Sequence, residues 1–264
     1  MSAPAQTPFL PKYLQRPDGP RIAYHAIVGK SPGVMFCGGF SSDMTGVKAE
    51  ALADWAKAAN RAFVRFDYSG HGASDGEFRD GTIGAWRDDA LAVLDQIAKG
   101  PQVVVGSSMG GWIMLSLALA RPQRIAGLVG IAPAPDFTER LIWQKLNANA
   151  RRQLSESGIY FEPSEYSLEP TPITLQLIQE GRRHLLLDAA IRIDCPVRIL
   201  HGMQDADVPW RMGQLLAEKI TSPDVTVTLV KSGDHRLSQP ADIERMIATV
   251  SALVESIEAQ RDSG

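Results

Sequence analysis

The 264-residue sequence has no long apolar run and no excess of basic charge. Its 27 Lys and Arg stand against 30 Asp and Glu, which gives a formal net charge of −3. Nucleic-acid binding normally depends on an excess of positive charge, so we exclude a primary nucleic-acid role. No segment approaches the roughly 20 apolar residues of a membrane-spanning helix, so we expect no membrane span.

Cysteine is also scarce. Cys37 and Cys195 are the only two, and neither lies in a CxxC motif or at metal-ligand spacing. We expect both to be buried free thiols, and we expect no metal and no cofactor because the histidines are scattered. The first eight residues contain neither the basic segment nor the apolar core of a secretory signal, so we expect a soluble cytoplasmic protein.

The composition is that of a packed globular protein, with 44% hydrophobic and 22% charged residues. Apolar runs rich in β-branched residues alternate along the chain with segments that have helical apolar spacing. The predicted strands are 21–28, 33–37, 62–66, 102–105, 125–131, 197–200 and 225–230, and the predicted helices are 45–59, 82–98, 109–120, 212–220 and 241–257. This alternation predicts an α/β fold with a mostly parallel central sheet flanked by helices.

Residues 133–194 interrupt the alternation, because they contain no convincing strand. Helical patterns at 141–154 and 173–186 surround a proline-rich centre. We therefore divide the chain into a core, 1–132 and 195–264, and a helical cap or lid insertion, 133–194. Apolar cap residues can line a pocket, but at helical spacing they more often pack, so we expect packing for Leu141, Ile142, Trp143, Ile159, Tyr160 and Phe161.

A Gly-x-Ser-x-Gly motif lies at residues 106–110, after a predicted buried strand and before a predicted apolar helix. This context makes Ser108 a candidate nucleophile on a tight strand-to-helix turn, because Gly106 and Gly110 let the chains pass without Cβ clashes. Ser107 fails as the motif serine, because the two glycine positions of the motif would then fall on Val105 and Met109. The alternative, that the serine only caps a helix, is less consistent with this context.

The candidate acid and base follow in the order that such a nucleophile requires. Asp205 lies in the polar loop after strand 197–200, with Asp207 as the alternative acid. His235 lies in the loop after the last predicted strand and is the candidate base. The other histidines, His25, His71, His184 and His201, are in less suitable positions. A neutral imidazole at position 235 would take the Ser108 proton while the carboxylate orients the ring.

A nucleophile of this kind needs two N–H donors for the tetrahedral oxyanion. One is the backbone N–H of Met109, the residue after the serine. We assign the second to the N–H of Phe40, because it follows a strand and the glycine pair 38–39. The glycine-containing loop 67–74 lacks dinucleotide-site spacing and is expected to position neighbouring loops.

These motifs resemble those of the α/β-hydrolase superfamily over nearly the whole chain. Residues 67–74 are similar to its DxxGxGxS loop, 106–110 to its nucleophile elbow and 201–209 to its HGxxDxxVP loop. Residues 65–70, 105–112, 201–210 and 232–236 more closely resemble the family of mitochondrial palmitoyl-protein thioesterases, also known as mycophenolic-acid acyl-glucuronide esterases, although we expect no transit peptide in this chain. The resemblance implies hydrolysis of acyl thioesters or activated acyl esters, with Ser108, Asp205 and His235 at matching positions in a bacterial relative.

The leading hypothesis is a serine hydrolase whose partner is a small acyl ester or thioester, or an acylated protein. Alternatives are a small-molecule carboxylesterase or an amide or carbon–carbon bond hydrolase of the same fold. Dehalogenase and epoxide hydrolase relatives carry Asp where this chain has Ser108. A non-catalytic binding module is the least favoured, because such proteins normally lose one member of the triad.

Overall fold

The computed structural model describes residues 10–17, 19–162 and 170–262. Of the proline-rich centre of the insertion, 158–172, residues 163–169 lie outside the described residues, as do the first eight residues of the chain. An eight-stranded sheet with the order β1-β2-β4-β3-β5-β6-β9-β10 forms the centre of the molecule. Its strands are β1 (Lys12–Leu14), β2 (Ile22–Ile27), β3 (Lys30–Cys37), β4 (Arg61–Phe66), β5 (Gln102–Ser107), β6 (Ile125–Ile131), β9 (Val197–Gly202) and β10 (Val225–Val230).

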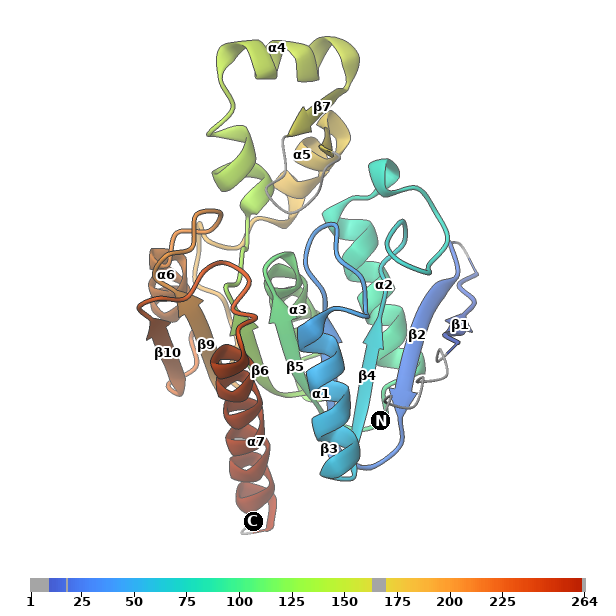
Figure 1. Cartoon of the computed structure of the whole chain (residues 1–264), viewed down its shortest axis with the longest axis vertical. Coiled ribbons are helices and arrows are strands. Elements are labelled where there is room, and N and C mark those ends of the chain that lie inside the picture. Colours follow the sequence, from blue (N-terminus) through green and yellow to red (C-terminus); the bar gives the residue numbers. More distant parts are fainter. Residues whose placement is uncertain (1–9, 18, 163–169, 263–264) are drawn as a thin grey trace, which may run out of the picture.

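The sheet is mostly parallel, as the sequence predicts. β2 pairs antiparallel with β1 and β4, and the remaining neighbours are parallel. Parallel strands end at the same edge of a sheet, so the loops after β3, β4, β5, β9 and β10 meet there. Figure 1 shows the cap above this edge.

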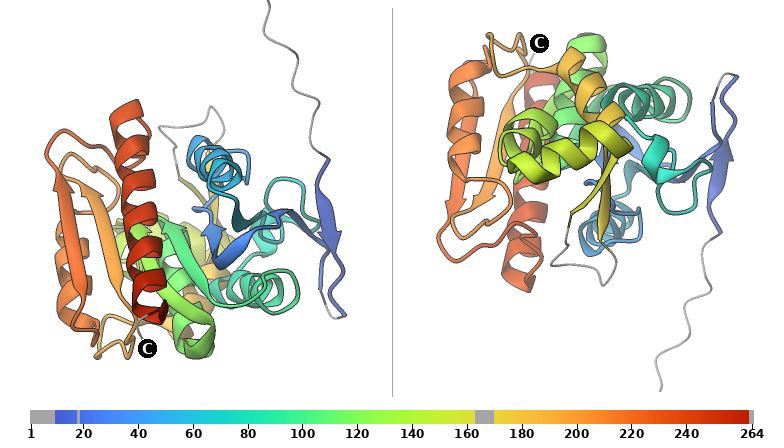
Figure 2. Two further views of the ribbon diagram at one scale, coloured as in Figure 1. Left: turned by 90° about the horizontal axis from the view of Figure 1, so that it is seen from below. Right: turned by 90° about the horizontal axis from the view of Figure 1, so that it is seen from above.

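Helices cover both faces of the sheet (Figures 1 and 2). Side chains alternate between the faces along each strand. Val34, Phe36, Val103 and Val105 belong to the core that packs under α1 (Val47–Ala58) and α7 (Pro240–Asp262). Met35, Cys37 and Val104 belong to the core under α2 (Ile83–Gln96), α3 (Met109–Ala120) and α6 (Arg211–Lys219). This double burial explains the continuous apolar runs within the central strands.

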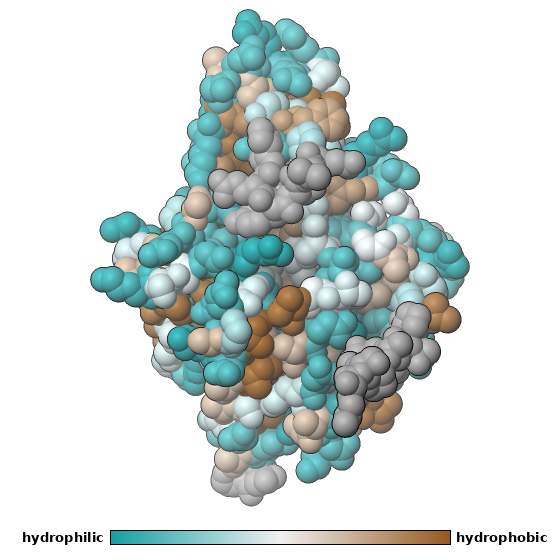
Figure 3. Space-filling view, in the orientation of Figure 1, coloured by the Kyte–Doolittle hydropathy of each residue, from teal (hydrophilic) through white to brown (hydrophobic). Residues whose placement is uncertain are grey.

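The segment between β6 and β9 forms the cap. It contains η3 (Thr138–Trp143), α4 (Ala148–Ser157), β7 (Ile159–Glu162), β8 (Thr171–Thr174), α5 (Leu175–Gly181) and η4 (Arg182–His184). Buried Leu154, Ile173 and Ile178 form its own small core. On the face in Figure 3, hydrophilic residues cover most of the outer end of the cap.

Two partly buried hydrogen bonds join the cap to the core domain. A Glu180 Oε2 atom accepts the Gly84 N–H at 3.1 Å, at the N-terminal end of α2, where negative charge is favourable. Trp112 of α3 donates its indole N–H to the His184 carbonyl at 3.0 Å. α5 and η4 therefore hydrogen-bond directly to the core domain.

The structure corrects parts of the sequence analysis. The insertion is not purely helical, because β7 and β8 pair antiparallel. The predicted helix 141–154 is divided into η3 and α4, and 173–186 begins as a strand. The short edge strand β1 and the 3-10 turns η1 (Phe78–Asp80) and η2 (Pro122–Arg124) were not expected. Cys37 is buried, but Cys195 is only partly buried; both are free thiols.

Candidate active site

Ser108 lies on the turn between β5 and α3. Its backbone has φ 53° and ψ −118°, a left-handed conformation that is strained for serine. Its N–H donates to the Ile131 carbonyl at 2.9 Å, and its own carbonyl accepts the Ala134 N–H at 3.0 Å. A Cβ at Gly106 would lie 2.3 Å from the Gly110 carbonyl oxygen, so the turn requires glycine there.

His235 connects Ser108 to Asp205 through both ring nitrogens. Its Nδ1 lies 2.8 Å from Asp205 Oδ2, and its Nε2 lies 3.0 Å from Ser108 Oγ. An ionised carboxylate only accepts, so Nδ1 carries the proton and Nε2 keeps the lone pair that can accept the Ser108 hydroxyl proton. The structure thus brings together the three side chains that the sequence analysis selected as nucleophile, base and acid.

Asp205 is held as a carboxylate by the groups around it. Its side chain is fully buried. Burial alone raises the pKa of the Asp205 carboxyl group, but the hydrogen bonds from His201 and His235 outweigh this effect and lower the pKa to about 2. Oδ1 also accepts the N–H groups of Asp207 at 3.0 Å and Val208 at 2.7 Å. Asp207, the alternative acid, is exposed and supplies a backbone donor to Asp205.

His201 is a participant that the sequence analysis set aside. It is 0% exposed, and its Nε2 lies 3.0 Å from the Val208 carbonyl oxygen and 3.2 Å from Asp205 Oδ2. Nε2 therefore carries a proton and faces Asp205 Oδ2, the same carboxylate oxygen that His235 Nδ1 contacts. Its place four residues before the acid was the only available signal, because a sequence does not show which ring atom faces which carboxylate.

Close packing holds the His235 loop beside the Asp205 loop. A Cβ at Gly202 would lie 2.3 Å from the Gly233 carbonyl oxygen, and the Gln204 N–H donates to that oxygen at 2.9 Å. From α1, Lys48 Nζ donates to the Arg236 carbonyl oxygen at 2.6 Å. The base is therefore fixed from both the β9 side and the α1 side.

The two candidate oxyanion donors flank Ser108. Met109 is the first residue of α3, where helical N–H groups lack partners within the helix. The loop that carries Phe40 lies against Ser108, because a Cβ at Gly39 would be 3.5 Å from Ser108 Cβ. In the described part of the chain, neither the Phe40 N–H nor the Met109 N–H has an acceptor.

The arrangement has the parts needed for acyl transfer: an activated hydroxyl, a base with a fixed tautomer and unpaired N–H donors beside it. Asp205, Asp207 and His235 also offer potential ligand atoms within 4.8 Å of one another. A metal ion bound there would compete for the atoms that join Asp205 to His235.

Among the described residues, no helix combines the length and the apolar character that a membrane span requires.

Residues 34–246 match the alpha/beta hydrolase family. The chain belongs to this family. The hydrolase is 43% identical over 246 residues to the mitochondrial palmitoyl-protein thioesterase ABHD10 of Mus musculus, which covers 93% of this chain and 82% of that protein. These similarities make it a hydrolase of the esterase or thioesterase type.

Two solved structures share the fold of the hydrolase. A putative hydrolase from Agrobacterium vitis S4 has a TM-score of 0.89 and 43% identity, with 94% of this chain and 100% of that one covered. Alpha/beta hydrolase domain-containing protein 10 from mouse has a TM-score of 0.87 and 41% identity, with 94% and 99% covered. The predicted fold class and superfamily are therefore confirmed.

Proposed function

We propose that this hydrolase cleaves acyl thioesters or activated carboxylic esters through an acyl-enzyme intermediate, with Ser108, His235 and Asp205 as its catalytic triad. The observation that carries the proposal is the hydrogen-bonded line from Ser108 Oγ through His235 to Asp205 Oδ2, at 3.0 and 2.8 Å. The thioester part rests on the similarity to proteins named palmitoyl-protein thioesterase. The substrate is a small acyl ester or thioester, or an acylated protein.

In the first half-reaction, Ser108 Oγ attacks the carbonyl carbon while its proton passes to His235 Nε2. The oxyanion accepts hydrogen bonds from the backbone N–H groups of Phe40 and Met109. When the intermediate collapses, the bond from carbon to sulfur or oxygen breaks, and His235 gives its proton to the leaving group. Water then repeats the sequence on the acyl-enzyme, releasing the carboxylic acid and restoring Ser108.

The acyl chain is proposed to lie between the core domain and the cap, against Phe40. The Phe40 ring packs at 5.4 Å from Phe137, measured between ring centroids, and also contacts the apolar core of the cap. Ile142, Trp143 and Tyr160 pack within that core rather than standing free, as expected. Phe161 departs from this expectation because it is 50% exposed.

The test is hydrolysis of matched acetyl, octanoyl and palmitoyl thioesters and their p-nitrophenyl esters by wild type and Ser108→Ala. We expect a thioester preference that rises with chain length and is lost in Ser108→Ala. Activity on short esters alone would replace the thioesterase proposal with a small-molecule carboxylesterase. Activity that survives in Ser108→Ala would overturn the mechanism.

The cytoplasmic location expected from the sequence stays a prediction. Fractionation of the native organism, with antibody detection of the hydrolase, would test it. Recovery in a membrane or organelle fraction would contradict it.

A further inference from the structure

The loop with Phe40 is held by groups that the triad does not use. The Ser41 N–H, the donor next to that of Phe40 along the chain, donates to His71 Nε2 at 3.3 Å. Ser41 itself has φ 56°, a left-handed conformation that is uncommon for a residue other than glycine. His71 comes from the loop after β4, so a different part of the chain fixes this peptide group.

The tautomer of His71 follows from its two contacts. Nδ1 lies 3.2 Å from the Ser69 carbonyl oxygen, which can only accept, so Nδ1 carries the proton. Nε2 then holds the lone pair that accepts the Ser41 N–H. His71 is only 4% exposed, and burial lowers its pKa to about 4, so the ring is neutral near neutral pH.

The ring of His71 is also fixed by aromatic packing. Its centroid lies 5.0 Å from that of Phe78 and 5.2 Å from that of Trp86. The same two rings pack against Phe40, at 4.9 Å and 5.8 Å. His71 thus belongs to the group that locates the side chain of Phe40 as well as its following peptide.

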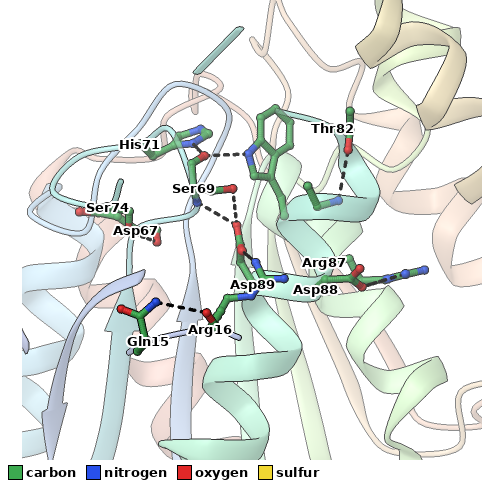
Figure 4. Close-up of polar contacts among 12 residues, drawn as sticks. Gln15, Arg16, Asp67, Ser69, His71, Ser74, Thr82, Arg87, Asp88 and Asp89 are labelled. Carbon is green, nitrogen blue, oxygen red and sulfur yellow. Dashed lines mark hydrogen bonds and ion pairs between the residues drawn. The ribbon is translucent and has the colours of Figure 1, made fainter. Parts of the chain in front are cut away.

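Ser69, the acceptor for His71, is anchored in turn. The Ser69 carbonyl oxygen also accepts the Trp86 indole N–H at 3.1 Å, while Asp89 Oδ2 accepts the Ser69 N–H at 2.8 Å and its hydroxyl at 2.7 Å. Asp89 is 0% exposed and forms an ion pair with Arg16. Figure 4 shows this line of contacts from Arg16 to His71. A satisfied buried network of this kind is rigid, so it fixes the position of the His71 acceptor.

We propose that His71 is a positioning residue that aims the Phe40 N–H at the oxyanion by holding the Ser41 N–H through its Nε2. The inference rests on the proposed function, since it gives a role to the donor of that mechanism. His71 does not touch the reacting atoms, and it acts through the backbone of the loop 38–42. Because Ser41 is exposed, its N–H can turn to water when His71 is replaced, so the loop changes while the fold persists.

The test compares His71→Phe with wild type on one p-nitrophenyl ester, with active sites titrated by a fluorophosphonate. Phenylalanine keeps the aromatic packing and removes both hydrogen bonds. Deleting one oxyanion donor costs about 10²–10³ in kcat, so a displaced donor should lower kcat per titrated site about 10- to 100-fold while KM stays within about threefold. The inhibition constant of a trifluoromethyl ketone, whose adduct on Ser108 carries the oxyanion, should rise by the same factor as kcat/KM falls.

Two further variants separate positioning from stability. His71→Asn can donate to the Ser69 carbonyl but is too short to reach the Ser41 N–H as well, so its kcat should also fall. Ser74→Ala is the control in the same loop as His71. The Ser74 hydroxyl donates to the Asp67 carbonyl oxygen at 2.7 Å and accepts the Ala23 N–H at 2.8 Å, and the substitution removes both hydrogen bonds. It should lower the melting temperature and leave kcat per titrated site unchanged. Hydrogen exchange of the Ser41 amide should accelerate at least tenfold in both His71 variants and not in Ser74→Ala.

The outcomes distinguish this inference from the proposed function. If wild-type activity depends on Ser108 but both His71 variants keep wild-type kcat and inhibitor affinity, the positioning role is wrong and the proposed function stands. A change in KM alone also overturns the positioning role. If Ser108→Ala hydrolyses the ester as fast as wild type, both the proposed function and this inference fail.

Discussion

Replacement of Asp205 by asparagine tests the site at its most constrained atom. Oδ1 of Asp205 accepts two backbone N–H groups, from Asp207 at 3.0 Å and Val208 at 2.7 Å. The asparagine carbonyl oxygen will occupy that position, which places the NH₂ group where Oδ2 now faces His235 Nδ1. Two donors cannot bond to each other, so His235 moves its proton to Nε2. Ser108 then has no acceptor for its hydroxyl proton.

The wrong tautomer sets the magnitude of the effect. In a Ser-His-Asp triad this substitution lowers kcat by about 10⁴ with the geometry intact. That factor corresponds to about 5 kcal/mol of transition-state stabilisation. KM should change little, because Asp205 is buried below His235 and does not face substrate.

The same substitution affects stability in a pH-dependent way. The pKa of Asp205 is lowered to about 2 in the folded protein, against an ordinary value of 3.8. A lowered carboxyl pKa stabilises the folded state above pH 4, and this contribution disappears as the pH falls from about 4 to about 2. The difference is worth about 2 kcal/mol. The stability difference between wild type and Asp205→Asn should therefore shrink by about that amount across this interval.

Pre-steady-state and steady-state hydrolysis of a p-nitrophenyl ester, with urea denaturation at pH 7 and pH 2, would measure both effects. Asp207→Asn is the matched control, because Asp207 is exposed and donates to Asp205 through its backbone, which the substitution preserves. Its kcat should stay within about threefold of wild type. A larger loss in Asp207→Asn than in Asp205→Asn would refute this assignment of the acid.

Two further predictions concern the packing beneath the site. A Cβ at Gly110 would lie 2.0 Å from the Cys37 carbonyl oxygen, so Gly110→Ala should lower the free energy of unfolding by about 1–3 kcal/mol in urea denaturation. Gly46→Ala is the control and should not be destabilised, because the heavy atom nearest to its Cβ would be 3.6 Å away. Equal stabilities of the two variants would contradict the close approach of α3 to β3. Burial raises the pKa of the Cys37 thiol to about 12, so iodoacetamide at pH 8 should not modify Cys37 in the native protein. In the unfolded protein both cysteines should be alkylated, as mass spectrometry of the peptides would show. Rapid labelling of Cys37 in the native protein would contradict its burial.

The parts of the site that sequence predicts are those fixed by backbone geometry. Ser108 could be selected because only a glycine pair permits its turn, and Asp205 and His235 because each follows a strand that ends at the same edge of the sheet. His71 and His201 could not be assigned, because their roles depend on which ring nitrogen meets which buried atom. No pattern of residue types carries that information.

The fold shows the same division. The central strands β5 and β6 carry buried apolar runs because both faces of the sheet are covered there, and this signal is strong in sequence. The hairpin of β7 and β8 is short and is stabilised by the cap core that includes Ile173 and Leu154. Local preference alone does not predict it, because the contacts that stabilise it come from α4 and α5.

The cap occupies the connection between two adjacent parallel strands, β6 and β9, and this affects how the protein can fold and be re-engineered. The chain leaves β6 at the carboxyl edge and must return to the opposite edge before β9 begins, so the insertion serves as a crossover as well as a cover. Ser108 precedes this crossover and His235 follows it, 127 residues later. Recovery of activity during refolding therefore reports closure of a contact that spans the crossover rather than formation of the first strands. A cap taken from a relative must bring its own returning segment, because the insertion begins at the C-terminal end of β6 and ends at the N-terminal end of the parallel strand β9.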